Sequence, residues 1–314
     1  MQKIVFLDRD SLDATVRRPS FEHDWTDHPG TTPADVVARL KDATIAITNK
    51  VPLRAADIEQ LPALKMVAAA ATGTDNIDLA ACRARGIVVS NIRNYSLVSV
   101  PEHVFTLILA LRRNLLAYSA DVAAGRWQAQ ERFCLLDHPI GDLAGSRIGI
   151  VGFGALGHKV ALLARAFGME VCVTSRSPVE DPGVTVLPLA ELLSSCDVVS
   201  LHLPLNDQTR NMIGAAELAT MKPTALLINT ARGGLVNEAA LAEALRGGVI
   251  GGAGFDVLSK EPPSADNPLL GIDQPNFILT PHVAWASAGA MQTLADMLVD
   301  NLEAFVQGQP TNVV

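Results

Sequence analysis

Glycines at a fixed spacing are the first residues of this chain whose types suggest a chemistry. Gly152, Gly154 and Gly157 give the pattern G-x-G-x-x-G between an apolar, strand-like stretch and a helix-like stretch. There the first glycine permits a tight turn, the second lets backbone approach a pyrophosphate, and the third lets helix and strand pack closely. Backbone N–H groups and the helix dipole attract the phosphates. The pattern predicts a dinucleotide site that includes Ala155 and Leu156; the alternative is a purely structural turn.

The residues after the next predicted strand indicate which dinucleotide is bound. In NAD-binding proteins a carboxylate at this strand end normally binds the adenosine ribose hydroxyls. Here the position reads Ser175, Arg176 and Ser177, without a carboxylate. One cation flanked by hydroxyls suits a 2′-phosphate. We therefore predict that NADP is favoured over NAD, and the alternative for Arg176 is a solvated surface arginine.

Ionisable side chains follow three of the later predicted strands. Arg232 lies in NTARGGLV, Glu261 in DVLSKEPP and His282 in LTPHVAWAS. Open α/β sheets bind ligands at the carboxyl ends of their strands, so these side chains are expected at one edge of the sheet. Each alone has an ordinary interpretation as a surface arginine, a solvated loop carboxylate or a packed histidine. Together, on the cofactor edge, they form a candidate catalytic set.

The composition limits the classes of partner. The chain has 314 residues, of which 49% are hydrophobic and 18% are charged, and its formal net charge is −8. This length favours two domains, and without a long basic block neither nucleic-acid nor anionic-membrane binding has electrostatic support. The longest apolar run, at 104–111, is too short to span a bilayer, and the N-terminus lacks the apolar core of a signal peptide.

Cysteine and histidine usage bears on compartment and metal content. The four cysteines have no C-x-x-C spacing, and the seven histidines form no cluster with metal-ligand spacing. We therefore predict reduced thiols in a cytoplasmic protein and no protein-bound metal.

The elements that position these residues are apolar segments alternating with short helices, which favours parallel sheets covered on both faces. Predicted strands lie at 4–7, 45–48, 66–71 and 87–90, and then at 148–151, 170–174, 184–187, 197–201, 225–229, 251–257 and 277–280. We expect an α/β fold of two doubly wound parallel-sheet domains. A Rossmann cofactor domain, 99–284, is inserted in a flavodoxin-like substrate domain, 1–98 plus 285–314. A cleft between the domains would bring the substrate to the cofactor.

Two predicted helix starts carry capping signals. Thr32 precedes Pro33, which suits an N-cap followed by the first helical position. Ser99 to Glu102 reads S-x-x-E with an early proline, a capping box. We expect the second signal to open a long helix that continues towards Gly125 and connects the domains.

The order of GFGALG, NTARGG, KEPP and TPH resembles the D-2-hydroxyacid dehydrogenase family over nearly the whole chain. The segment 71–78, ATGTDNID, resembles the family's substrate loop. Three segments, 49–51, 137–145 and 282–287, resemble its glycerate dehydrogenase (hydroxypyruvate reductase) branch. The missing strand-end carboxylate departs from the family's NAD-using pattern and affects the cofactor choice, not the reaction class.

The resemblance implies catalytic roles that the side-chain chemistry supports. Arg232 would bind the substrate carboxylate and the adjacent carbonyl oxygen through its planar fork. His282 would be the general acid in ketone reduction and the base in the reverse direction. Glu261 would orient the imidazole and favour its protonated form. The cofactor would supply the hydride.

The resemblance also implies binding residues. In the first domain, backbone N–H groups around Ala71, Thr72 and Gly73 would hold the substrate carboxylate; the alternative is a glycine turn without a ligand. Asp256 would contact the nicotinamide carboxamide or, alternatively, cap a strand end. Further implied contacts are Asn49, Lys50 and Trp285 on the substrate side, and His202, Pro204, Thr230 and Ala231 on the cofactor side. Trp285 has the alternative of a core residue.

The function that follows from this resemblance is reduction of a small 2-oxo acid, hydroxypyruvate or glyoxylate, with NAD(P)H. The family also implies a homodimer. An alternative of another class is a nucleotide-sensing binding protein similar to the corepressors that resemble this family, since fold alone does not separate the two. A phosphoglycerate dehydrogenase is less favoured, because the chain ends soon after its last predicted helix.

Overall fold

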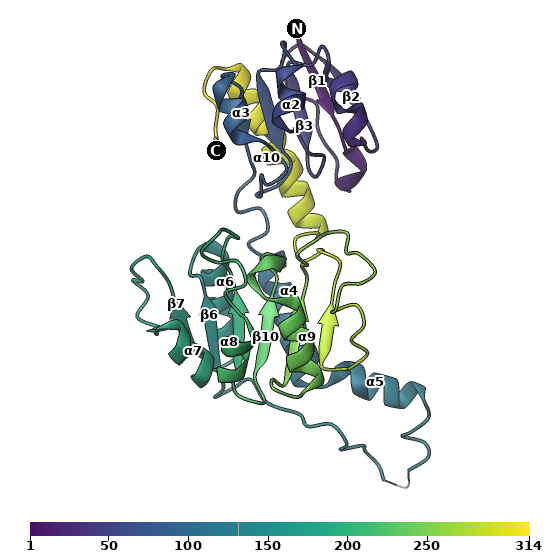
Figure 1. The fold of residues 1–314 in the computed structure, drawn as a ribbon, viewed down its shortest axis with the longest axis vertical. Helices are drawn as coiled ribbons and strands as arrows, with labels where there is room; N and C mark the ends of the chain where they lie inside the picture. Colours follow the sequence, from purple (N-terminus) through teal and green to yellow (C-terminus); the bar gives the residue numbers. More distant parts are fainter. Residues whose placement is uncertain (131) are drawn as a thin grey trace. The chain divides into compact units, whose positions relative to one another are not determined.

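The computed structural model describes residues 1–130 and 132–314, which form two compact units. The first unit contains Met1–Ser96 and Ala286–Val314, and the second contains Leu97–Trp285. Each unit has one parallel sheet with helices on both faces, which confirms the predicted doubly wound α/β class (Figure 1). The boundaries expected from the sequence, after residues 98 and 284, lie within two residues of the observed ones.

The first unit has a five-stranded sheet in the order β2-β1-β3-β4-β5. Its strands are β1 (Gln2–Phe6), β2 (His23–Asp27), β3 (Ile45–Thr48), β4 (Met66–Ala69) and β5 (Val88–Ser90). This is the flavodoxin-like strand order, with the switch point between β1 and β3. The sequence analysis missed β2, because the edge strand HDWTD has no apolar run.

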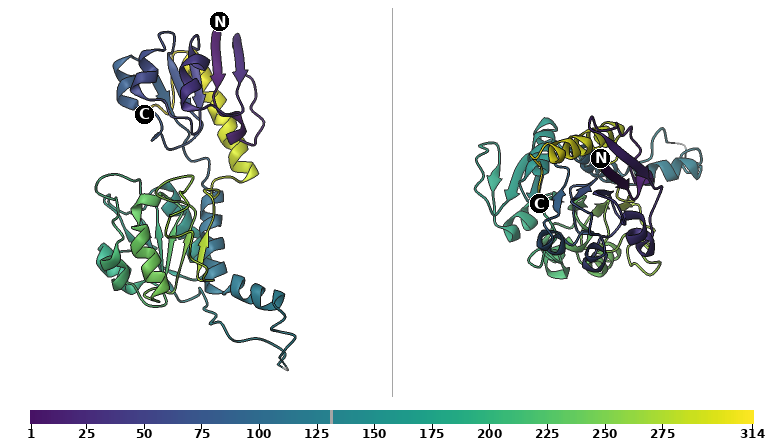
Figure 2. Two further views of the ribbon diagram at one scale, coloured as in Figure 1. Left: turned by 45° about the vertical axis from the view of Figure 1, so that its right-hand side comes forward. Right: turned by 90° about the horizontal axis from the view of Figure 1, so that it is seen from above.

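Helices cover both faces of this first sheet. The short helices α1 (Val36–Leu40), α2 (Ala55–Glu59) and α3 (Leu79–Ala84) lie on one face, and α10 (Ala288–Val306) lies on the other (Figure 2). Alternate strand residues therefore enter different cores: Val5 and Val67 pack with α1 to α3, whereas Ile4 and Met66 are buried on the α10 side.

The second unit has a seven-stranded sheet in the order β12-β11-β10-β9-β6-β7-β8. The strands are β6 (Arg147–Val151), β7 (Glu170–Thr174), β8 (Thr185–Val186), β9 (Val198–Leu201), β10 (Leu226–Asn229), β11 (Gly252–Phe255) and β12 (Phe277–Leu279). Counted from β6, this is the Rossmann order 3-2-1-4-5-6 with one additional strand at the edge.

Two helical layers sandwich the second sheet. Helices α4 (Ser99–Arg112) and α6 (Ala155–Ala166) share one core with Ile148 and Ile228. Helices α7 (Leu189–Ser195), α8 (Ala215–Thr220) and α9 (Glu238–Arg246) share the other core with Val199 and Leu227 (Figure 1).

Strand register decides which residues meet at the carboxyl edge of this sheet. Leu201 pairs with Val151 on one side and with Asn229 on the other. Phe255 pairs with Asn229 and with Leu279. The last residues of five strands are thus aligned, so the segments that follow them start at the same edge.

The structure contradicts the predicted cap at Ser99. The N-cap of α4 is Val98, and the Ser99 hydroxyl lies inside the helix, where it donates to the carbonyl of Trp285 at 3.3 Å. The predicted long helix is also interrupted. Asn114 adopts a left-handed conformation with φ of 49°, which separates α4 from α5 (Leu115–Ala123).

Thr32 is the N-cap residue that the sequence predicts, with Pro33 in the first position of the turn, but its side chain does not make the capping hydrogen bond. Its hydroxyl donates to the carboxylate of Asp35 at 2.7 Å and caps no backbone N–H. The chain therefore enters α1 through the short 3₁₀ turn Pro33–Asp35.

Candidate functional site

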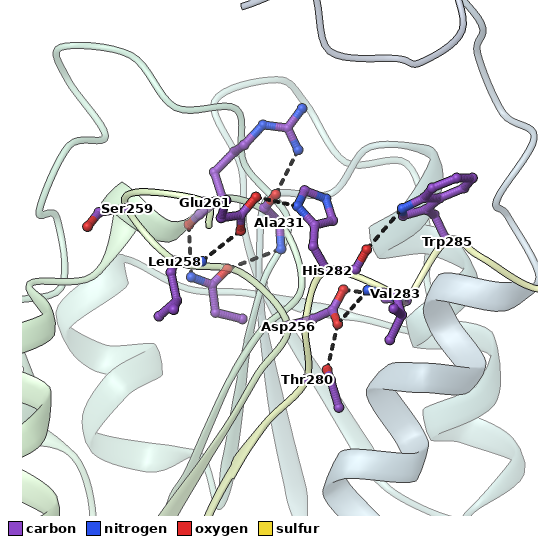
Figure 3. A network of polar contacts seen from close by, with 12 residues as sticks. Ala231, Asp256, Leu258, Ser259, Glu261, Thr280, His282, Val283 and Trp285 are labelled. Atoms are coloured by element: carbon purple, nitrogen blue, oxygen red, sulfur yellow. Dashed lines mark hydrogen bonds and ion pairs between the residues drawn. The ribbon is translucent and has the colours of Figure 1, made fainter. Parts of the chain in front are cut away.

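A histidine–glutamate pair lies above the carboxyl edge of the second sheet (Figure 3). His282 Nδ1 and Glu261 Oε2 are 2.6 Å apart, and Glu261 Oε1 accepts the N–H of Leu258 at 2.8 Å. Both carboxylate oxygens therefore have donors, which holds Glu261 in one orientation. Because Nδ1 faces the glutamate, Nε2 is the ring nitrogen that can exchange a proton with a ligand.

The backbone of His282 has an uncommon conformation that neighbouring contacts maintain. Its φ is 56°, in the left-handed region that few non-glycine residues adopt. Asp256, only 1% exposed, accepts the N–H groups of Val283 at 2.9 Å and Ala284 at 2.8 Å, and the Thr280 hydroxyl at 2.5 Å. Asp256 thus caps the His282 loop, which agrees with the second of the two interpretations that the sequence allowed for this residue.

Arg232 follows β10 in an extended conformation and is partly exposed. Its guanidinium Nη1 donates to the carbonyl of Ala231 at 2.7 Å. The buried Asn229 fixes this turn, since its side chain donates to the Arg232 carbonyl at 2.9 Å and accepts the Ala231 N–H at 3.1 Å. Sequence analysis did not single out Asn229, although a polar residue ending a buried strand is a usable signal.

The Arg232 turn and the Glu261 loop touch through their backbones at Gly233. A Cβ on Gly233 would lie 1.9 Å from the carbonyl carbon of Leu258 and 2.2 Å from the nitrogen of Ser259. Only a residue without a side chain fits between these segments, so Gly233 sets the separation of the arginine and the glutamate.

Replacing Gly233 by alanine is expected to force the two loops apart and lower kcat/KM by about 10²-fold, since misplacement by about 1 Å has this effect on catalysis. Gly289→Ala is the matched control, because none of the described residues has an atom within 4 Å of the Cβ that alanine would add there. Steady-state kinetics with thermal melting checks the prediction. Wild-type activity in a folded Gly233→Ala protein would contradict it.

Glu238, in the first turn of α9, anchors the loop that carries Glu261. Its carboxylate accepts the N–H of Ser259 at 2.5 Å, the Ser259 hydroxyl at 2.9 Å and the Asn267 side chain at 2.8 Å. The sequence analysis treated Glu238 only as the start of a helix, because nothing local identifies its distant partners.

The glycine turn has the shape that a pyrophosphate requires. Gly152 has φ of 96°, and a Cβ there would lie 2.5 Å from the carbonyl oxygen of His202. A Cβ on Gly157 would lie 2.4 Å from the carbonyl oxygen of Gly152. At Gly154, by contrast, a Cβ would meet no atom of the described residues within 4 Å. The turn is therefore closed on the protein side and open where phosphates would lie, next to Ala155 and Leu156 at the start of α6.

The residues predicted to bind the adenosine end of a cofactor follow β7. Ser175 follows β7, and its hydroxyl accepts the N–H of Ser177 at 3.2 Å. Arg176 is exposed, and its guanidinium lies 3.5 Å from the side-chain oxygen of Gln208. No carboxylate occupies 174–178, so the described residues at this strand end offer a phosphate a cation and two hydroxyls.

Other predicted cofactor residues lie at the same edge. Desolvation lowers the pKa of His202 to about 4, so its ring is neutral at pH 7, and Nε2 lies 2.8 Å from the Ser200 hydroxyl. The Thr230 hydroxyl is buried and has no hydrogen-bond partner among the described residues. Pro204 is exposed, and its carbonyl accepts the Thr209 hydroxyl. A nicotinamide cofactor fits this edge, which has a glycine turn open to phosphates and, among the described residues, a buried hydroxyl without a hydrogen-bond partner. Trp285 donates to the His282 carbonyl at 3.0 Å and so supports the histidine loop.

The predicted substrate residues of the first unit lie in two loops of that unit. Asp8, which is buried, accepts the N–H groups of Asn49 at 2.9 Å and Lys50 at 2.7 Å and so shapes their turn. The other loop follows β4, where Ala71 is buried and Thr72 is exposed. The structure thus places these residues after β3 and β4, on the carboxyl side of the first sheet.

The described residues contain no group of three or more side chains that could hold a metal ion. None of the helices formed by these residues has the length and apolarity needed to cross a membrane.

Comparisons with known proteins agree with this geometry. The family model for the D-isomer specific 2-hydroxyacid dehydrogenase, NAD binding domain, matches residues 105–284. A glycerate dehydrogenase from Methylorubrum extorquens is 54% identical over 314 residues, covering 100% of this chain and 99% of that protein. A hydroxypyruvate reductase from Blautia hydrogenotrophica is 36% identical over 283 residues, covering 89% of this chain and 87% of that protein.

A solved structure has the same fold over the full chain. The NADPH-dependent glyoxylate/hydroxypyruvate reductase from Sinorhizobium meliloti, in complex with citrate, superposes with a TM-score of 0.85 at 29% identity. The match covers 100% of this chain and 98% of that structure. With the glycine turn and the histidine–glutamate pair at one sheet edge, these similarities lead to one conclusion: the chain belongs to the D-2-hydroxyacid dehydrogenase family, in its glycerate dehydrogenase and hydroxypyruvate reductase branch.

Proposed function

We propose that this protein reduces hydroxypyruvate or glyoxylate to the 2-hydroxy acid, with a nicotinamide cofactor as hydride donor. The observation that carries the proposal is the 2.6 Å contact between His282 Nδ1 and Glu261 Oε2. It lies at the same edge as the glycine turn, which supports one centre for hydride and proton transfer. The similarity to a glycerate dehydrogenase over the whole chain supports the substrate class.

The side chains divide the chemistry between them. Arg232 holds the substrate carboxylate and draws charge from the adjacent carbonyl oxygen through its planar set of donors. His282 Nε2 donates a proton to that oxygen as it becomes a hydroxyl. Glu261 keeps the ring oriented and stabilises the positive charge before the proton leaves. When bound, the nicotinamide ring supplies the hydride.

The first unit contributes a carboxylate site in this proposal. Ala71 and Thr72 direct their carbonyl oxygens towards the segment 91–92: the Ala71 carbonyl accepts the Ile92 N–H at 2.9 Å, and the Thr72 carbonyl accepts the Asn91 side chain at 2.7 Å. In a trans peptide the N–H points away from the carbonyl oxygen. The N–H groups of Thr72 and Gly73 therefore face away from that segment and are oriented to bind an anion.

Purified protein tests the proposed reaction directly. Hydroxypyruvate and glyoxylate are expected to consume NADPH, followed by its near-ultraviolet absorbance, and a chiral assay is expected to identify the D-product. Absence of turnover over a panel of 2-oxo acids with either cofactor would contradict the enzyme and favour the nucleotide-sensing alternative. No observation on the described residues favours that alternative over the reductase.

The cofactor preference is proposed to be NADP, with Arg176 as the 2′-phosphate contact. Arg176→Leu is expected to raise the Kd of NADPH about tenfold or more, the scale of one charge-assisted hydrogen bond, and to leave the Kd of NADH nearly unchanged. Arg147→Leu is the control. Arg147 pairs at 3.0 Å with Glu170, which begins β7, and so lies at the end of the sheet opposite to Arg176. Fluorescence titration measures both constants. An equal change in the Kd of NADPH and of NADH would mean that Arg176 is a surface arginine that does not contact the 2′-phosphate.

A homodimer is proposed through the segment after α4. This segment exposes Phe133 by 89% and Leu136 by 78%, with further exposed apolar residues in α5. The Tyr118 hydroxyl of α5 donates to the carbonyl of His138 at 2.6 Å, which joins two described parts of the segment. Large apolar side chains exposed within one segment are typical of a protein interface.

Charging this surface is expected to give a monomer. The double variant Phe133→Asp and Leu136→Asp should halve the mass measured by light scattering, because carboxylates disfavour an apolar interface. Leu162→Asp is the control, as Leu162 is 55% exposed on α6. An unchanged dimer mass in the double variant would place the interface elsewhere.

We also propose a cytoplasmic location, which the four free cysteines support.

A further inference from the structure

We propose that Asn91, Asn301 and the segment 311–314 form a network that positions the 71–73 loop for the substrate carboxylate. The inference rests on the proposed function of that loop. It concerns the first unit only, and none of these network residues belongs to the glycine turn or to the histidine–glutamate pair.

Asn91 is the residue through which the network reaches the loop. It is 6% exposed, and its side-chain nitrogen donates to the Thr72 carbonyl at 2.7 Å. The Thr72 hydroxyl in turn donates to the carbonyl of Ile92 at 2.6 Å. Together with the Ile92 N–H to Ala71 contact, these bonds fix two successive peptide planes. Rotation of the Thr72–Gly73 peptide would redirect the N–H that faces the substrate, so Asn91 determines its direction.

Asn301 holds Asn91 from the other side. It lies inside α10 and is 1% exposed, between positions that carry the buried Leu298 and Leu302. Its side-chain nitrogen donates to the Asn91 carbonyl at 3.0 Å. A buried amide is costly unless its hydrogen bonds are made, and an apolar residue would pack here without that cost. The position of an asparagine in this core therefore points to a positioning role.

The segment 311–314 completes the arrangement. Thr311 and Asn312 both donate from their side chains to Asn301 Oδ1 at 2.9 Å. The Asn312 carbonyl accepts the Asn91 N–H at 3.1 Å, and the Val314 N–H donates to Val89 at 3.0 Å. Asn91 is thus held at its N–H and its carbonyl while its side chain holds the loop. Such a connected network keeps each member in one orientation.

The expected signature is a change in substrate affinity without a change in the chemical step. With hydroxypyruvate and NADPH, Asn91→Ala is expected to raise KM for hydroxypyruvate about tenfold, as expected for a lost carboxylate contact. The values of kcat and of KM for NADPH should stay within about twofold. Asn301→Ala is expected to raise KM about threefold, and the double variant should be no worse than Asn91→Ala, because the two residues act in series.

Two further variants separate positioning from loss of stability. Asn91→Asp keeps the size and the acceptor towards Arg93, which donates to Asn91 Oδ1 at 3.1 Å, but it cannot donate to Thr72. It is expected to raise KM for hydroxypyruvate as Asn91→Ala does, and so it provides the same test should Asn91→Ala fail to fold. Leu298→Ala removes a fully buried side chain of α10, the helix that carries Asn301. It should lower the melting temperature and leave KM for hydroxypyruvate unchanged.

Binding of oxalate, measured by calorimetry with NADPH present, gives a readout that does not require turnover. Its Kd should rise in the Asn91 variants and stay unchanged in Leu298→Ala. Wild-type KM and oxalate Kd in folded Asn91→Ala or Asn91→Asp would overturn the network, as would an equal rise in Leu298→Ala. A wild-type protein that neither reduces 2-oxo acids nor binds oxalate would instead overturn the proposed function, and this inference with it.

Discussion

Replacing His282 by alanine is expected to lower kcat for hydroxypyruvate reduction by about 10²- to 10⁴-fold, the usual contribution of a positioned general acid. The cause is the loss of the proton donor whose Nδ1 lies 2.6 Å from Glu261. His282 is not among the residues that we propose to contact the cofactor, so the Kd of NADPH should change by less than about twofold. Single-turnover kinetics and fluorescence titration measure the two effects.

Glu261→Gln is the companion variant for this prediction. The amide has nearly the size of the carboxylate and can still accept one hydrogen bond, but it carries no charge to balance a protonated imidazole. We expect a smaller loss of kcat than in His282→Ala. In the double variant, the loss should be no larger than in His282→Ala alone, since the glutamate acts through the histidine. Substantial turnover by His282→Ala would mean that another group supplies the proton.

Replacing Arg232 by leucine is expected to lower kcat/KM for 2-oxo acids by about 10²- to 10⁴-fold. This range follows from the loss of two charge-assisted hydrogen bonds at about 1.5–3 kcal/mol each. Much of the effect should appear in KM, because the arginine binds the substrate carboxylate in the ground state as well as in the transition state. Steady-state kinetics with hydroxypyruvate as the varied substrate measures the change.

Arg232→Lys distinguishes charge from geometry. Lysine keeps the positive charge but cannot offer two parallel donors, so it should recover only part of the lost kcat/KM. Arg176→Leu is the control within the same unit, because it should leave KM for the 2-oxo acid unchanged. Full activity in Arg232→Lys would show that charge alone is sufficient, and unchanged KM in Arg232→Leu would assign carboxylate binding to other residues.

The strand-end positions of the candidate residues could be predicted because they are local features of the sequence. Five strands of the second unit, β6, β7, β9, β10 and β11, end directly before a predicted site residue, such as Gly152, Thr230 or Asp256. Parallel strands bring their carboxyl ends to one edge, so this placement needed no knowledge of side-chain contacts. The roles of Arg232, Glu261 and His282, by contrast, were predicted from the resemblance of their motifs to the family, with which the chemistry of the side chains agrees.

The helix caps could not be predicted with the same success, because a cap depends on which hydrogen bond prevails. Ser99 has the residue type of a cap, yet its hydroxyl donates to the carbonyl of Trp285 from within α4. Thr32 likewise bonds a neighbouring carboxylate in place of the backbone. Short polar side chains have several local partners of similar strength, and the tertiary structure selects among them.

By itself, the sequence determined the two parallel-sheet domains and the glycine turn, because apolar periodicity and glycine spacing are encoded within short segments. The resemblance of its motifs added the family and the residues proposed for proton transfer and substrate binding. The tertiary structure alone decided how those residues are held. Gly233 touches the backbone of Leu258, Asp256 caps the His282 loop, and Asn301 connects the end of the chain to Asn91. These contacts join residues from tens to hundreds of positions apart. Residue type gives the bonding capacity of each group, whereas folding determines which partner lies within reach.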